Sequence, residues 1–193
     1  SKIFYGPQYK SVHSTNIAVD KQDNIYIGGH YNGTFQVDTI EIPYNHDEGN
    51  DIFMVKLDPD GAAIWGQYFS AESEEGWAEI SSVAVDSGSV YFSFQYSVPL
   101  IINGVPLPYT SPWYWLAVAK ASQETGVVEN VLPFGSDGIQ TIEEIKPDRE
   151  NNILVTGCFT GGSALNIGSF TLNGMGDDDG YFFKMNQDFE VLW

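Results

Sequence analysis

The chain has few basic residues for its size. It contains 8 lysines and arginines against 26 aspartates and glutamates, which gives a formal net charge of −18. This balance argues against nucleic-acid binding, because neutralising phosphates requires clustered Lys and Arg. It also disfavours contact with anionic membrane surfaces. Such a charge suits solubility, or a medium whose salt or divalent cations screen the self-repulsion.

Cysteine and long apolar runs are also scarce. Cys158 is the only cysteine, so no intrachain disulfide and no four-cysteine metal site can form. No apolar run approaches the roughly 20 residues that span a bilayer, so no membrane insertion is expected. No secretory signal stands at Ser1, and we expect any export signal to have been removed or to lie outside this sequence. Convincing helical periodicity is missing as well.

A repeated phrase is the most informative feature present. Lys56, Lys120 and Lys184 are spaced 64 residues apart, and each lies in a similar apolar run. The other landmarks keep the same spacing, with an acid at the end of an earlier apolar run in each copy: Asp20, Asp86 and Asp148. A repeat of this length is a supersecondary unit that must stack on its copies to bury its faces.

Each copy is predicted to consist of about five extended segments, since apolar residues alternate with polar ones and turn residues separate the runs. In the first copy the segments are roughly 16–20, 24–30, 35–42, 51–58 and 62–70. The first, second, fourth and fifth would form a four-stranded sheet, with the third as an extra strand or ribbon in a connection. This predicts an all-β, β-propeller-type fold.

The repeat divides one domain, residues 1–193, into three blades of about 64 residues, approximately 1–65, 66–129 and 130–193. Trp65 and Trp193 occupy the same phase of the repeat, so the N-terminal strand could complete the last blade. Three blades are fewer than the usual four to eight. The chain is therefore interpreted as part of a larger propeller or array, or as a unit that closes with copies of itself.

These phrases resemble SBBP (seven-bladed β-propeller) repeats of bacterial secreted and cell-surface proteins. The first copy carries Asp20, Asn24, Tyr26, Gly33-Thr34-Phe35, Asp51, Phe53, Lys56-Leu57-Asp58, Gly61 and Trp65, and the third carries Asp148, Asn152, Thr156-Gly157, Asp179, Lys184 and Trp193. The second copy is degenerate, with Trp115 in place of the acid before its lysine phrase. The resemblance implies adhesion, scaffold or interaction regions, and a shared fold does not fix an activity.

Two sets of polar residues are candidate sites. The recurrent lysines could each bind an acidic ligand, but pairing with a recurrent aspartate in the sheet is the favoured interpretation. Aspartates in matching turns could hold calcium, which needs six to eight oxygen ligands, although their spacing does not match a known calcium loop and solvated turns are favoured. The candidate calcium ligands are Asp47, Asp51, Asp177, Asp178 and Asp179.

Aromatic residues form a third candidate. Trp113, Tyr114 and Trp115 lie in the variable connection of the second copy, and such rings suit sugar stacking or protein contacts. Their alternation would put Trp113 and Trp115 on one side and Tyr114 on the other. Packing is favoured for Trp115, which leads into a predicted core strand.

No catalytic motif is present, so the chain is predicted not to be an enzyme and to need no cofactor, with calcium as the exception left open. The favoured function is a secreted or cell-surface structural or adhesive module that binds protein partners or copies of itself. The alternatives are a carbohydrate-binding propeller that binds glycans and an accessory domain of a secreted hydrolase.

Overall fold

The computed structural model describes residues 4, 10–45, 49–71, 76–109 and 114–193. All regular structure in these ranges is β-strand, so the prediction of an all-β protein is confirmed. No helix of a length and apolarity that could cross a membrane occurs in this described part of the chain.

Three antiparallel sheets contain the long strands, and neighbouring strands are hydrogen-bonded in the same sequence order in each. Sheet I contains β1 (Val12–Val19), β2 (Ile25–Tyr31), β5 (Asp51–Leu57) and β6 (Ala63–Phe69). Sheet II contains β7 (Ala78–Val85), β8 (Ser89–Tyr96), β11 (Trp115–Ser122) and β12 (Val128–Phe134). Sheet III contains β13 (Gln140–Pro147), β14 (Ile153–Thr160) and β17 (Asp178–Met185).

A short hairpin lies in the connection between the second and third strands of each sheet. The hairpins are β3 (Phe35–Val37) with β4 (Ile40–Ile42), β9 (Ile101–Ile102) with β10 (Val105–Pro106), and β15 (Ala164–Ile167) with β16 (Phe170–Asn173). Segment 35–42 was expected as one strand or ribbon, and it turns back at Asp38, whose φ is 53°. Aspartate tolerates this left-handed backbone better than most residues, which explains the turn.

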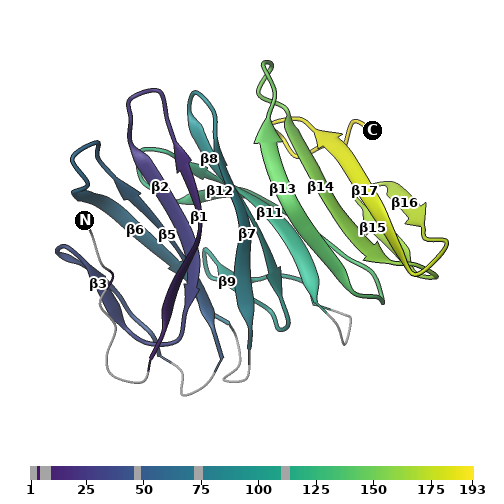
Figure 1. Ribbon diagram of the computed structural model, residues 1–193, viewed down its shortest axis with the longest axis horizontal. Coiled ribbons are helices and arrows are strands. Elements are labelled where there is room, and N and C mark those ends of the chain that lie inside the picture. Colours follow the sequence, from purple (N-terminus) through teal and green to yellow (C-terminus); the bar gives the residue numbers. More distant parts are fainter. Residues whose placement is uncertain (1–3, 5–9, 46–48, 72–75, 110–113) are drawn as a thin grey trace.

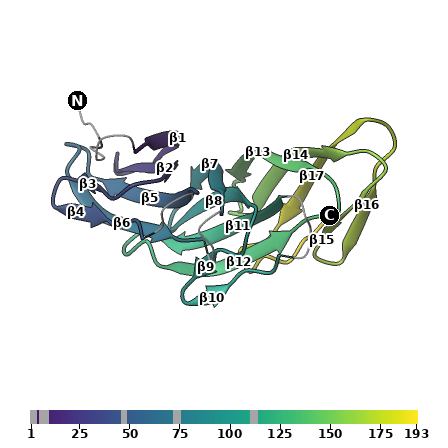
Figure 2. The same cartoon turned by 90° about the horizontal axis from the view of Figure 1, so that it is seen from below.

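The sheets pack face to face, with sheet II between sheets I and III (Figures 1 and 2). One core lies between sheets I and II and contains Met54, Val83 and Phe92. A second core lies between sheets II and III and contains Val118 and Ile145. We call the face of a sheet on the N-terminal side of the stack its front face and the opposite face its back face. The back faces of sheets I and II pack on the front faces of sheets II and III.

A β-bulge interrupts the first strand of each sheet at the same place. The irregularities lie between Ser14 and Asn16, between Ile80 and Ser82, and between Ile142 and Glu144. A bulge bends and twists a strand and frees backbone groups from the ladder. The first strands of neighbouring sheets contact one another, as Figure 1 shows for β1, β7 and β13.

The front face of sheet I has its own smaller core. Tyr31, Phe53 and Val55 are buried there beneath the β3–β4 hairpin. Phe4 lies against this core, with its ring centroid 5.9 Å from those of Phe35 and Phe53. The rest of the N-terminal segment, which was expected to complete the last blade, lies outside the described residues.

Candidate functional site

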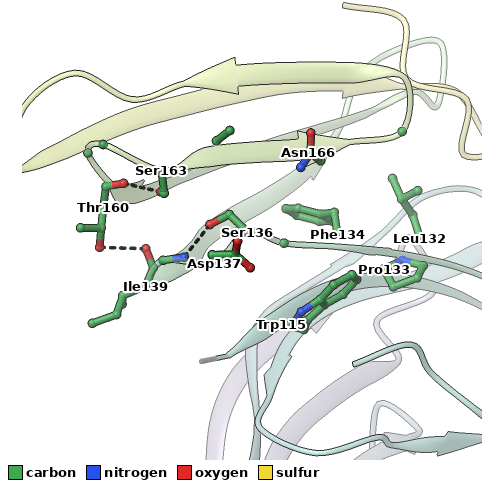
Figure 3. A pocket seen from close by; sticks show the side chains of 16 residues that line it. Trp115, Leu132, Pro133, Phe134, Ser136, Asp137, Ile139, Thr160, Ser163 and Asn166 are labelled. Carbon is green, nitrogen blue, oxygen red and sulfur yellow. Dashed lines mark hydrogen bonds between the residues drawn. The ribbon is translucent and has the colours of Figure 1, made fainter. Parts of the chain in front are cut away.

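An open cleft of about 970 Å³ lies between the β11–β12 edge of sheet II and the loops of sheet III. Figure 3 shows its walls: the ring of Trp115 faces one side, with Pro133 and Phe134 nearby. The other side is formed by the segments 135–139 and 160–168. The combination of an apolar ring with several polar groups is typical of a small-molecule or sugar site.

Backbone geometry brings Trp115 against the floor of this cleft. A side chain on Gly135 would begin 3.2 Å from the indole ring, so a glycine at this position lets the ring lie against the main chain. Gly135 also accepts a backbone hydrogen bond from Asn166, 3.3 Å long, which joins the two walls. The Trp115 Nε1–H is buried and has no hydrogen-bond partner among the residues that the structure describes.

A hydrogen-bond network fixes the polar wall. The Ser136 hydroxyl donates to Gln140 Oε1 over 2.6 Å, and the buried Gln140 amide donates to the carbonyl of Tyr114. The amide N–H of Gly138 donates to the Ser136 hydroxyl oxygen over 3.1 Å. These bonds hold the turn that carries Asp137, whose exposed carboxylate lines the cleft.

The three predicted aromatic residues do not form one described platform. Trp115 forms the cleft wall, whereas the ring of Tyr114 lies 5.1 Å from that of Trp77, centroid to centroid. Trp113 lies outside the described residues, so its predicted role stays a prediction.

The recurrent lysines take different partners in the three sheets. In sheet I, Lys56 Nζ donates to the carbonyl of Gln123 over 2.9 Å and lies over the ring of Tyr26. The Tyr26 hydroxyl donates in turn to Asp20 Oδ2 over 3.1 Å. The indole N–H of Trp65 also donates to Gln123, so one carbonyl of sheet II receives two side chains of sheet I.

Sheets II and III vary this arrangement. In sheet II the Tyr91 hydroxyl donates to Asp86 Oδ2 over 2.9 Å, and Lys120 lies 3.9 Å from Glu129. In sheet III the tyrosine position is occupied by Leu154, which has no hydroxyl.

There the ammonium of Lys184 pairs directly with Asp148 at 2.6 Å. This contact holds the pKa of the Asp148 carboxyl well below its ordinary value and raises that of Lys184. All three arrangements serve packing between or within sheets, and none leaves a lysine aimed into a cavity.

The candidate calcium ligands are not brought together. Asp51 is buried in sheet I, where its Oδ1 accepts the amide of Ala71 over 2.9 Å. Asp177, Asp178 and Asp179 lie in sheet III or just before its last strand, with sheet II in between. Asp47 lies outside the described residues. Across the described ranges, no group of three or more His, Cys, Asp or Glu side chains could hold a metal ion.

Several cleft residues were missed from the sequence, above all Asp137, Gln140 and Asn166. Two glycine-containing turns, 135–138 and 161–162, were the available signal, because such turns let the main chain approach a ligand closely. Gln123 was missed as well, since its contribution is a backbone carbonyl that any residue could supply.

A scan against protein-family models finds no match for this chain, and a search of curated proteins finds no relative. The resemblance to SBBP repeats therefore rests on the residues quoted above and stays a prediction.

Proposed function

We propose that the chain is a non-catalytic, β-propeller-type module of a secreted or cell-surface protein, and that its work is assembly. Its sheets are the proposed blades, and its binding surfaces are their apolar faces and the loops at their ends. The acidic surface keeps such a module soluble in a salt-rich medium.

One observation carries this proposal: consecutive sheets of the same strand order stack through corresponding faces. The back face of sheet I meets the front face of sheet II, and the back face of sheet II meets the front face of sheet III. The first strands of successive sheets lie side by side, which is the arrangement of inner strands around a propeller axis.

Cross-linking on intact producing cells tests this function. A membrane-impermeant, amine-reactive cross-linker, added to the culture, should modify the protein's lysines before lysis, on the cells or in the medium, and join the protein to a neighbouring protein. Mass spectrometry of the adduct identifies the joined peptides. Protection from the reagent until lysis would refute the surface location, and labelling without any protein adduct would refute assembly.

The cleft supports a second candidate function, carbohydrate recognition. The Trp115 ring offers a stacking surface, and the Asp137 carboxylate and Asn166 amide offer hydrogen bonds to hydroxyl groups.

A glycan array followed by calorimetry tests this candidate. Asp137→Ala should weaken binding of any glycan found by at least about tenfold without changing the melting temperature, because Asp137 is exposed and its loss leaves no buried group unpaired. Asp188→Ala, at an exposed turn outside the cleft, is the matched control. Equal binding by both variants would exclude the cleft as the site.

A further inference from the structure

We infer that two copies of this chain dock head to tail, with the back face of sheet III of each copy on the front face of sheet I of the other. This inference rests on the proposed assembly function and names the partner and the surface. The two sheet-on-sheet interfaces inside the chain, I on II and II on III, show which face should cover each open face.

Corresponding residues show how a back face is covered inside the chain. Met54, Val118 and Phe182 occupy the same register position on the third strand of their sheets, two residues before the recurrent lysine. Met54 and Val118 are 1% and 0% exposed because the next sheet covers them. Phe182 is 70% exposed and has the ring of Trp193, itself 53% exposed, beside it, while Leu154 on the neighbouring strand is 38% exposed. Sheet III thus presents uncovered the kind of surface that sheets I and II bury.

The front faces show the reciprocal pattern. Ile17, Val83 and Ile145 correspond on the first strands, each three residues before the recurrent acid. Val83 and Ile145 are 7% and 2% exposed, whereas Ile17 is 63% exposed. Val19, two residues further along β1, is 53% exposed. Ile17 also lines a shallow hollow of about 380 Å³ on this part of sheet I.

The internal interfaces indicate which residues should meet. A side chain on Gly28 would touch Val83 at 2.9 Å and Met54 at 3.0 Å, so these two side chains lie beside the same glycine in the first core. In the dimer, Ile17 of one copy takes the position that Val83 has in the first core. Phe182 of the other copy takes the position that Met54 has there. The two exposed residues are therefore placed to pack on each other.

A polar contact repeats beside this apolar one. The side chain of Asn16 accepts a hydrogen bond from the amide of Val83 over 3.2 Å, and the hydroxyl of Ser82 accepts one from the amide of Ile145 over 3.2 Å. Glu144 occupies the corresponding place on β13; its side chain is half exposed, and one of its carboxylate oxygens, Oε1, pairs with Lys146 over 2.7 Å. Its second oxygen, Oε2, is the acceptor we expect for the equivalent amide, that of Ile17 in the second copy.

Closure then limits the number of copies to two. Two copies supply six sheets, which lies within the roughly four to eight blades of known propellers, and both open faces of each chain are used.

Each copy carries a net charge of −18. Because like charges repel and salt screens them, the dimer should be stronger at about 1 M than at about 0.15 M salt.

Sedimentation equilibrium of the purified chain tests the inference, with Ile17→Glu and Phe182→Glu as the interface variants. The wild type should form a dimer of the 21.4 kDa chain, and either variant should raise the dissociation constant at least about 100-fold, since the change places a charge in both contacts of the closed dimer. Val105→Glu is the matched control: Val105 is 64% exposed on the β9–β10 hairpin, away from both faces, and its variant should dimerise as the wild type does.

Mixing the two interface variants tests the head-to-tail geometry. The mixture contains one intact back face and one intact front face on different chains, so a dimer with one normal contact should return. A symmetric contact between two front faces or two back faces would instead leave one single variant fully dimeric. That result, or no recovery on mixing, would overturn the inference.

The outcomes also separate this inference from the proposed function. A wild type that stays monomeric up to about 1 M salt would overturn docking between copies. If cells still give a cross-link from this protein to a different protein, assembly stands with another occupant. If cells give no cross-link at all, the proposed function fails whatever the purified chain does.

Discussion

Replacing Met54 with alanine tests the stacking of sheets I and II most sharply. The side chain is 1% exposed and packs in the core between them, beside Gly28 and Val83. Truncating a buried methionine removes apolar contacts and leaves a cavity, which costs roughly 2 to 5 kcal/mol. For a chain of this length each kcal/mol corresponds to roughly 2 to 4 °C, so the melting temperature should fall by roughly 4 to 20 °C.

Phe182→Ala is the matched control, because it truncates a larger side chain at the same register position of sheet III. Phe182 is 70% exposed within one chain and meets the edge of the Trp193 ring, 5.5 Å away between centroids, so its loss should cost no more than about 1.5 kcal/mol of unfolding free energy. Both variants are compared with the wild type by urea unfolding at a concentration where the chain is monomeric. Equal losses, or a Met54→Ala loss below about 1 kcal/mol, would refute the packing of these sheets.

Three further outcomes are expected. Burial holds the pKa of His30 below its ordinary 6.5, so the unfolded chain binds a proton on this residue more readily than the folded one. Stability should therefore fall as the pH drops below about 6.5. The urea midpoint, measured against pH, should fall less steeply in His30→Gln than in the wild type. In Lys184→Met the pKa of Asp148 should rise toward its ordinary 3.8, followed through carboxyl ¹³C shifts, and an unchanged pKa would contradict the pairing. Gly157→Ala should lower the free energy of unfolding by about 1 to 3 kcal/mol or more, because the added Cβ would lie 2.0 Å from a backbone carbonyl oxygen of β13. In the control Gly88→Ala the added Cβ meets nothing within 4 Å, so the free energy of unfolding should stay almost unchanged.

Much of the secondary structure could be predicted from the sequence because strand periodicity and turn residues are local signals. The five segments of the first copy correspond closely to β1, β2, the β3–β4 hairpin, β5 and β6. The hairpin turn at Asp38 could not be predicted, because the alternation of apolar and polar residues continues unchanged across a two-residue turn. Spacing alone also gave no indication of the bulge near Ser14, which depends on how one strand pairs with the next.

The candidate site was harder to predict because its residues come together through tertiary packing. Trp115 was identified by residue type, since aromatic rings suggest binding surfaces in any sequence. Asp137 and Asn166 lie 22 and 51 residues away from it in a strongly acidic chain, so neither stood out. The partners of Lys56 could not be predicted either, because one is the backbone carbonyl of Gln123, 67 residues further along.

A methyl NOESY spectrum of the monomeric wild type provides the most direct test of how the sheets stack. The packing around Gly28 predicts a cross-peak between the Met54 Cε methyl and a Val83 methyl, two groups on different sheets. Absence of this cross-peak, together with exchange peaks from water to both methyls, would show that sheets I and II do not pack on each other and would contradict the account.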